Sequence, residues 1–475
     1  MFKQLLGLWL VILLPACAIL HTELPSPAPE LPTDWSRETT AFCNTSPWWV
    51  QFHAPELDAL IKQSLAHNLS LQQAWARMYQ AEAVVRKTGA ERWPNLDGSF
   101  GPSHQRTGGK DIPETTSDNF SLGFSAGYEI DLWGRVRASQ ESASQAALAS
   151  KENLHAAALS LSGQVARAWL ALISIRQQEQ LLQRQLELNR DLLDLVQYRF
   201  SVSQASALDV YQQQQTVTAI EGSLITARAE KEVRLQQLSF LAGVSPASLV
   251  SSSAQDFPKL SSPPPGGLPS DLLAQRPDIR AQKAQLRSSS WAVTEAKADM
   301  LPALNLTGAF TFNASVLESL LDAWVLNLTA ELAGPIFDGG EKRAEIDRAR
   351  GVVEEDLATY RETVLQAIYE VEEALVREEQ YTLSTANITQ QVELTRKAYR
   401  EATFRYLNGL SDYLAVLREQ VNLITSQLDS ITNQEQLLAN RVTLHIALGG
   451  SWPETMQKPD SMSLSTAQHP PEQTP

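Results

Sequence analysis

FSLGFSAGYEIDLWGR, residues 120–135, is the stretch of sequence that decides the fold. Along it, apolar side chains alternate with polar or small ones, which is the period of a β-strand with one apolar and one polar face. About eleven residues of alternation is the length that a tilted strand needs to cross a bilayer. The alternation ends at Leu132-Trp133-Gly134, and a very long helical sequence begins. The stretch therefore predicts a strand that could face lipid, joined directly to a helix that could not.

The same arrangement returns about 206 residues later in LNLTAELAGPIFDGGE, residues 326–341. A second alternating segment precedes each copy, at residues 95–101 and again at 304–312. Each copy also has a helical segment that stops at a proline before the strands, and two long helical segments after them. A repeat with two strands and several helices in each copy is typical of a duplicated domain rather than a solenoid.

The helical segments are longer than those of ordinary globular proteins, and their apolar stripes are typical of coiled-coil packing. The longest segment of the first copy contains no proline, and Gly163 is its one weak position. Residues 102–119, between the first two strands, are polar and rich in glycine, so we expect a surface loop that completes a hairpin. The predicted helices are 55–92, 135–200, 207–241, 270–300, 341–406 and 411–448.

The N-terminus has the pattern of a secretory signal peptide over residues 1–16, where Lys3 precedes an apolar run too short to span a membrane. The sequence Leu14-Pro15-Ala16-Cys17 resembles the lipobox of bacterial lipoproteins, although proline is unusual at its position. In that case Cys17 is the lipidated first residue of the mature chain. Each buried CH₂ of the lipid contributes about 0.8 kcal/mol to anchoring. The alternative is an ordinary signal peptide with an incidental cysteine.

Composition divides the rest of the chain into anchor, repeats, linker and tail. Residues 17–47 hold the lipid anchor and a Pro-rich, extended tether, and residues 451–475 form a polar tail that we expect to be disordered. Between them lie the first structural repeat (48–250), a Pro/Ser/Gly linker (251–269) and the second structural repeat (270–450).

The formal net charge of -15 argues against nucleic acid as a partner, because phosphates require clusters of Lys and Arg. The two cysteines, Cys17 and Cys43, have no metal-ligand spacing, and the seven histidines are scattered without a ligand pair. No nucleotide-binding or hydrolase motif stands in the strand-to-helix setting that its chemistry needs. The sequence therefore predicts no enzyme activity, no catalytic residue, and no metal or other cofactor.

Four amphipathic strands in one chain cannot close a barrel, because the smallest common closed barrels have about eight strands. An open sheet edge in lipid would leave backbone groups unpaired, at a cost of several kcal/mol each. Chains must therefore pool their strands, eight in a dimer or twelve in a trimer. The periodicity does not choose between these two assemblies. The helices that leave the strands would form a tube on the periplasmic side.

The paired strand-to-helix junctions, the motif FDGG at 337–340, the motif FRYLNGLSDYLAVL at 404–417 and the lipobox resemble the TolC-like outer-membrane efflux proteins. The lipoprotein members of this family, called the NodT type, are the most similar branch. The resemblance extends over about residues 48–450. It implies a mixed α and β membrane protein, a homotrimer with four transmembrane strands per chain. Its twelve-strand β-barrel lies in the outer membrane of a Gram-negative bacterium and continues as a long α-helical barrel into the periplasm.

The resemblance also implies a function. Such a protein is the exit duct of a tripartite efflux pump that expels small toxic compounds or drugs. Its partners are a periplasmic adaptor protein, an inner-membrane transporter of the proton-driven RND class, and the lipid of the outer membrane. Two alternative functions stay open, namely the exit duct of a protein secretion system with the same fold, and a structural periplasmic coiled-coil lipoprotein.

In this family, contacts between neighbouring coils close the periplasmic tip of the helical tube at rest. The residues that match the family's latch are Tyr406, in the RYLNG element, and Asp209, in the LDV element. Arg405 is a candidate ion-pair partner, and Asp412 lies on the same tip. Exposed pairs of about 0.2–1 kcal/mol could hold a latch and still be broken by adaptor binding. Ordinary solvated charges beside a helix break are the alternative interpretation.

Two features depart from the pattern of the relatives. Ala415 and Arg418 stand where some relatives have a ring of aspartates, so no strong cation-binding constriction is expected there. Ser203 stands where the second repeat has Gly409, which predicts a less tight turn in the first repeat. Gly409 itself is expected to adopt a left-handed backbone.

Overall fold

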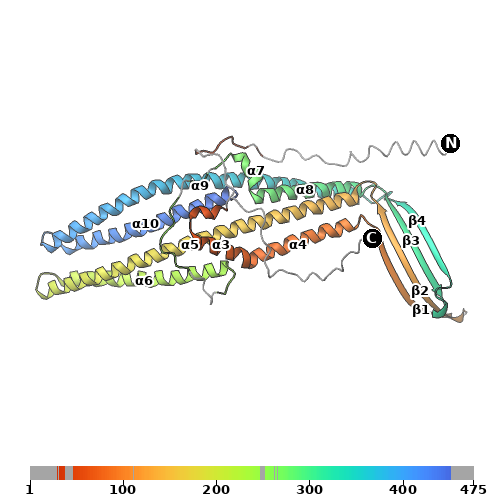
Figure 1. The fold of residues 1–475 in the computed structure, drawn as a ribbon, viewed down its shortest axis with the longest axis horizontal. Coiled ribbons are helices and arrows are strands. Elements are labelled where there is room, and N and C mark those ends of the chain that lie inside the picture. The colour runs from red at the N-terminus through yellow and green to blue at the C-terminus, as the bar shows by residue number, and fades with distance from the viewer. Residues whose placement is uncertain are drawn as a thin grey trace. The chain divides into compact units, whose positions relative to one another are not determined.

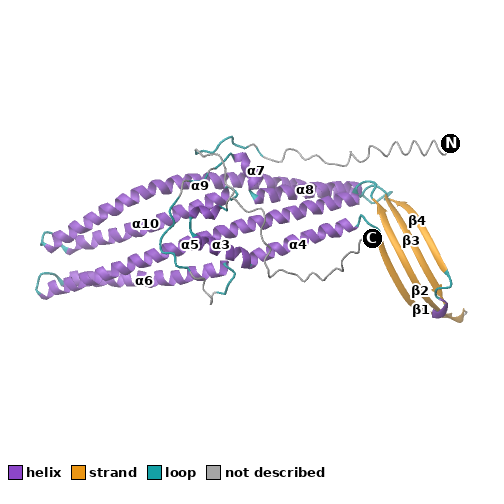
Figure 2. Cartoon of the chain, viewed as in Figure 1, coloured by secondary structure: helices purple, strands orange, loops and turns teal. Residues whose placement is uncertain are grey.

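The computed structural model describes residues 29, 31–37, 47–110, 112–245, 252–260, 263–264 and 266–450. The predicted signal peptide, the lipid attachment site at Cys17, Cys43 and the tail 451–475 lie outside the described residues. Long helices and a four-stranded sheet make up the fold (Figures 1 and 2). The chain divides into two compact units. One contains the sheet, with Ala76–Glu152 and Arg280–Thr363. The other is helical and contains Glu30–Trp75, Asn153–Ile279 and the chain from Val364 onward.

The observed helices match the predicted segments to within about two residues, apart from two breaks described below. Two helices, α5 and α9, are 67 residues long, which corresponds to roughly 100 Å each. The strands are β1 (Asn95–Gly109), β2 (Ile112–Ile130), β3 (Ala303–Ala314) and β4 (Trp324–Ala333). The helices are η1 (Trp48–Phe52), α3 (Pro55–His67), α4 (Leu69–Ala90), α5 (Arg135–Ser201), α6 (Ala207–Leu241), η2 (Pro269–Asp271), α7 (Leu272–Gln275), α8 (Pro277–Ala298), η3 (Leu317–Ser319), α9 (Glu341–Leu407) and α10 (Tyr413–Ala447).

The sheet is an antiparallel meander in the order β1-β2-β3-β4, so that β1 and β4 are its edges. Its register pairs Phe124 with Phe310 and Phe310 with Leu326. Because paired residues share a face, alternate positions of the strands form one apolar and one polar face, as the sequence predicts. On the apolar face, the ring of Phe310 lies 4.9 Å from that of Phe312 and 5.5 Å from that of Trp324. Clustered aromatic rings are typical of the interfacial girdle of a membrane barrel.

The prediction of a surface loop at 102–119 is wrong. The strand β1 continues to Gly109, and its pairing with β2 stays in register from Pro102 and Phe120 to Thr107 and Thr115. A ladder of backbone hydrogen bonds needs no particular side chains, and both faces of this outer part of the hairpin are exposed. Alternation identifies only the part of a strand that is buried on one side, so it missed this extension.

The two predicted helices 55–92 and 270–300 are each broken by one residue with an extended backbone. Arg276 separates α7 from α8 because a residue that precedes a proline, here Pro277, avoids the helical conformation. Asn68 separates α3 from α4 and caps α4, since its Oδ1 accepts hydrogen bonds from the N–H groups of Ser70 (3.0 Å) and Leu71 (3.1 Å). The apolar spacing continues across Asn68 and Arg276, so it predicted one unbroken helix in each case.

Asn68 and Arg276 each donate a hydrogen bond to the end of the last helix of their own repeat. The Nδ2 of Asn68 donates a hydrogen bond to the carbonyl oxygen of Leu241, the last residue of α6, at 3.0 Å. The Nη1 of Arg276 donates one to the carbonyl oxygen of Ala447, the last residue of α10, at 3.0 Å. The duplication seen in the sequence therefore extends to a specific side-chain contact, made by an amide in one copy and a guanidinium in the other.

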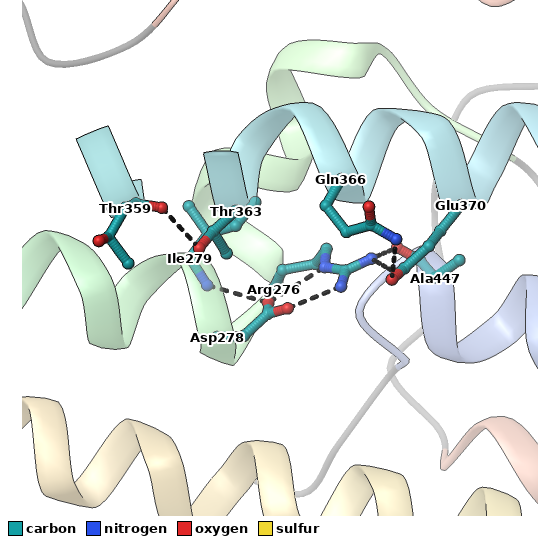
Figure 3. A network of polar contacts seen from close by, with 8 residues as sticks. All are labelled: Arg276, Asp278, Ile279, Thr359, Thr363, Gln366, Glu370 and Ala447. Carbon is teal, nitrogen blue, oxygen red and sulfur yellow. Dashed lines mark hydrogen bonds and ion pairs between the residues drawn. The ribbon is translucent and has the colours of Figure 1, made fainter. Parts of the chain in front are cut away.

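Figure 3 shows Arg276 at the centre of a polar network that joins α7, α8, α9 and the end of α10. Its guanidinium donates to both carboxylate oxygens of Asp278 (3.0 and 2.6 Å) and to Glu370 (2.7 Å). Burial lowers the pKa of Arg276, but Asp278 and Glu370 raise it by a larger amount, so the pKa lies above its ordinary value. The side chain is therefore a buried cation. A buried charge that is paired and hydrogen-bonded holds the helix ends in one arrangement.

Residues 31–37 of the predicted tether are attached to the helical unit. Trp35 is 8% exposed, and its Nε1 donates a hydrogen bond to the carbonyl oxygen of Gly267 in the linker at 3.0 Å. Arg37 pairs with Glu379 of α9 at 2.7 Å. The chain is therefore fixed to α9 and to the linker before its first helix begins.

Candidate functional site at the helical tips

The turns that end the two long helix pairs have the same conformation. Ser203 in the α5–α6 turn has φ 59°, and Gly409 in the α9–α10 turn has φ 72°. The N–H of Ser203 donates to the carbonyl oxygen of Phe200, and that of Gly409 to the carbonyl oxygen of Tyr406, both at 3.0 Å. The left-handed backbone predicted at Gly409 is confirmed, and the prediction of a less tight first turn is wrong. Serine adopts this conformation at a cost of about 1–2 kcal/mol, which the turn contacts offset.

The two aspartates assigned to the latch cap the helices that leave these turns. Asp209 and Ser206 form a capping box at the start of α6, with hydrogen bonds of 2.9 and 3.2 Å. Asp412 is the N-cap of α10 and accepts a hydrogen bond from the N–H of Ala415 at 3.4 Å. Both carboxylates also face the positive end of a helix dipole. Capping accounts for acidic residues here independently of any latch.

Tyr406 is the predicted latch residue that the structure buries. It is 5% exposed, and its ring lies 5.0 Å from the ring of Tyr413 on α10. Within the described part of the chain, its hydroxyl oxygen is buried without a hydrogen-bond partner. Burial raises the pKa of Tyr406, the charge of Arg199 lowers it and the charge of Asp209 raises it. The phenol therefore stays neutral, with a proton available for a hydrogen bond.

Arg199 of α5 is a contact between the coils that the sequence analysis did not identify. Its guanidinium carbon lies 4.9 Å from the centre of the Tyr406 ring, and its Nη1 donates to the carbonyl oxygen of Leu407 at 3.3 Å. A cation–π contact contributes about 0.5–1 kcal/mol at an exposed site and about 2 kcal/mol when desolvated, and the Tyr406 ring is buried. The duplication could have identified Arg199, because it occupies in the first repeat the position that Arg405 occupies in the second. Arg405 itself is exposed.

Apolar side chains of all four long helices meet in one core near the tips. The two coils, α5 with α6 and α9 with α10, therefore cannot separate there without exposing apolar surface, at about 25 cal/mol per Å². The buried members of this core are Val196, Val210, Tyr406, Tyr413, Val416 and Leu417.

The described residues contain no group of three or more His, Cys, Asp or Glu side chains that could hold a metal ion. One described helix, α5, includes a stretch that is long and apolar enough to cross a membrane, and 72% of that stretch is buried inside the protein. Its apolar residues are thus used in packing against other helices.

Comparison with known proteins identifies similar proteins over nearly the whole chain. The family model described as "Outer membrane efflux protein" matches residues 60–244 and 268–450, one match in each repeat. The pyoverdine export outer membrane protein OpmQ of Pseudomonas aeruginosa is 32% identical over 462 residues, which cover 94% of this chain and 97% of that one. The outer membrane protein OprJ of the same organism is 28% identical, over 94% and 96% of the two chains.

Solved structures have the same fold. The outer-membrane channel OprN matches with a TM-score of 0.81 and 25% identity, over 89% of this chain and 98% of that one. The CmeC outer membrane channel of Campylobacter jejuni matches with a TM-score of 0.85 and 23% identity, over 92% and 96% of the two chains.

Proposed function

Because this chain belongs to the outer membrane efflux protein family, we propose that it works as a lipid-anchored homotrimer of the NodT type, opened at its helical tip by a periplasmic adaptor protein. It is an outer-membrane channel of an efflux pump and extends into the periplasm. The observation that carries the function is a four-stranded sheet with one apolar face, whose strands continue into 67-residue helices in each of two repeats.

The edges of the sheet support a trimer. In one chain, β1 and β4 each have one unpaired side, and unpaired backbone groups in lipid cost several kcal/mol each. Three chains of four strands close a twelve-strand barrel, which is wide enough to leave an aqueous bore. The polar face of the sheet, which carries Glu129 and Asn305 in register, then lines this bore.

The relatives suggest the type of cargo. Their names include export of pyoverdine and efflux of toluene and solvents, so small molecules are the proposed substrates of this chain. An inner-membrane transporter of the RND class is the proposed energy-coupled partner. A duct of this kind needs no catalytic residue or cofactor of its own.

The gate is proposed at the helical tips, where Arg199, Asp209, Arg405, Tyr406 and Asp412 lie on the ends of the two coils. Within the described chain the buried hydroxyl of Tyr406 has no hydrogen-bond partner, and the carboxyl group of Asp209 lies at the same end of the coils. Exposed ion pairs among these residues are weak, at about 0.2–1 kcal/mol each, so binding of an adaptor can break them.

The gate is tested by the double variant Asp209→Ala with Tyr406→Phe. Detergent-solubilised wild-type protein should size as three chains and form channels of low conductance in planar bilayers. Loss of about 1 kcal/mol of closing contacts should raise the open fraction about fivefold in the variant. A matched control, Asp191→Ala with Tyr211→Phe, changes the same residue types at exposed positions near the same tip and should leave conductance unchanged. Wild-type conductance in the double variant would reject this gate, and a stable monomer would reject the trimer.

Lipidation is tested by Cys17→Ser. The wild-type chain should incorporate radiolabelled palmitate, and the variant should not, because the lipid is attached at the sulfur atom of Cys17. Cys43→Ser serves as the control and should label like the wild type. Equal labelling of both variants would show that the lipobox resemblance is incidental.

A further inference from the structure

Buried amide side chains from three helices meet just above the apolar core of the tips. Asn189 of α5 and Gln213 of α6 are fully buried, and Gln420 of α10 is 2% exposed. Tyr413, the first residue of α10, is 1% exposed and lies beside them. Uncharged polar groups are rarely buried this completely in a coiled-coil seam, since each must find a hydrogen-bond partner there.

These side chains form one hydrogen-bonded network, centred on Asn189. Its Oδ1 accepts from the Nε2 of Gln213 at 3.0 Å and from the Nε2 of Gln420 at 2.6 Å. Gln213 also donates to the backbone carbonyl oxygen of Asn189 at 2.8 Å, and its Oε1 accepts from the Tyr413 hydroxyl at 2.6 Å. The network therefore joins α10 of the second coil to both helices of the first coil.

One further polar contact joins the two coils, a partly buried hydrogen bond of 3.3 Å from Gln185 of α5 to Gln427 of α10. Two other buried polar residues of α10, Asn433 and Ser426, bond inside their own coil. Asn433 is 7% exposed, and its Nδ2 donates to Thr385 Oγ1 of α9 at 2.8 Å. Ser426 is 1% exposed and lies 3.0 Å from Thr395 of α9. Only a contact between the two coils resists their sliding past one another, so the two classes of contact should respond differently to substitution.

One acceptor of the network is unsatisfied. The Oε1 of Gln420 is buried without a hydrogen-bond partner in the described chain. A buried acceptor left unpaired destabilises the state that contains it, so the arrangement seen here is specific without being the most stable one for these groups. Buried polar residues in coiled coils fix register at a cost in stability in the same way.

We propose that Asn189, Gln213, Tyr413 and Gln420 form a register pin, a buried network that holds the second coil against the first and must break when the tip opens. The proposal rests on the proposed channel function and adds a second barrier, buried in the seam between the coils, to the contacts of the tip residues. The four residues are positioning residues, because they act on the passage of substrate only through the placement of α10. Their hydrogen bonds are directional, so a slide of α10 along the seam breaks them together, whereas apolar contacts re-form in a new register.

The test is the double variant Tyr413→Phe with Gln420→Leu, which removes both links from α10 to the network and keeps the buried volume. The open-to-closed ratio in planar bilayers should rise about tenfold, the factor that corresponds to about 1.4 kcal/mol. The single variant Tyr413→Phe removes one hydroxyl and should give a smaller rise. The melting temperature of the trimer should change little, since Gln420→Leu also removes the unpaired acceptor.

The matched control is Asn433→Leu, which removes a buried amide of the same helix that bonds only within its coil. It should lower the melting temperature and leave conductance unchanged. Folded trimers of the double variant with wild-type conductance would overturn the register pin, as would an equal conductance rise in Asn433→Leu. If the wild-type protein formed no channel at all, both the proposed function and the register pin would be rejected. If Asp209→Ala with Tyr406→Phe raised the conductance and Tyr413→Phe with Gln420→Leu did not, only the register pin would be rejected.

Discussion

Replacement of Gly243 with alanine is expected to reduce the yield of folded protein severely. Gly243 follows α6 with φ 71°, a left-handed backbone that costs an L-residue about 1–2 kcal/mol. A Cβ at this position would lie 2.3 Å from the carbonyl oxygen of His67 and 3.0 Å from the backbone nitrogen of Asn68. Backbone atoms cannot rotate away as a side chain can, so the overpacking adds about 1–3 kcal/mol. Together, the backbone strain and the overpacking should lower the free energy of unfolding by about 2–5 kcal/mol.

The measurement is the apparent melting temperature of the purified protein, together with its yield in the outer membrane. Gly222→Ala is the matched control, because Gly222 lies in the middle of α6 and a Cβ there would meet nothing within 4 Å. Alanine should stabilise that helical position by about 0.4–1 kcal/mol. The two substitutions in or beside one helix should therefore have opposite signs. A melting temperature for Gly243→Ala equal to that of the wild type would contradict the packing of this turn.

Replacement of Arg276 with methionine should also destabilise the protein strongly. The guanidinium forms hydrogen bonds with Asp278, with Glu370 and with the last carbonyl group of α10 (Figure 3). Removal of the guanidinium takes the positive charge away from both carboxylates in a partly buried site, although Asp278 still accepts from the N–H of Ile279 and Glu370 from the amide of Gln366. Loss of one partner of a buried ion pair typically costs about 3–5 kcal/mol. Lysine should not restore the wild-type stability, because one ammonium group cannot reproduce the planar fork of donors.

Arg348→Met is the control for Arg276. Arg348 pairs with Glu345 one turn earlier on α9, and their side chains are 64% and 45% exposed. Exposed pairs contribute about 0–1 kcal/mol, so this substitution should hardly change the melting temperature. If Arg276→Met and Arg348→Met had equal melting temperatures, the network around Arg276 would not contribute to stability. Restoration of stability by a second substitution, Glu370→Gln, would instead show that the unpaired carboxylate is the cause of the loss.

The sequence predicted the larger elements because their physical signals are strong and local. Strict alternation in 120–130 can only give one apolar and one polar face, and the helices after both junctions contain no proline. The duplication then doubled each signal. Elements without such a signal were missed, namely the outer half of the β1–β2 hairpin and the break at Asn68, where a single side-chain oxygen decides the backbone.

The candidate site was predictable only in part. The position of the tips followed from the helix breaks, and the caps at Asp209 and Asp412 use residue types that favour helix N-termini. The contact of Arg199 with Tyr406 and the amide network around Asn189 depend on how two coils far apart in sequence face one another. Residue spacing within one helix holds no information on that relation.

Asn68 and Arg276 make equivalent contacts in the two repeats, and this bears on how a duplicated chain evolves. The first repeat holds its last helix with a neutral amide, and the second holds it with a cation that needs two carboxylates. Both repeats are encoded in one gene, so every chain contains one of each. Each repeat can nevertheless acquire substitutions independently of the other. In the proposed trimer, six ancestrally identical joints become three neutral and three charged ones. The ring therefore has threefold and not sixfold symmetry at these joints, and a substitution in one joint leaves the other joint of the same chain unchanged.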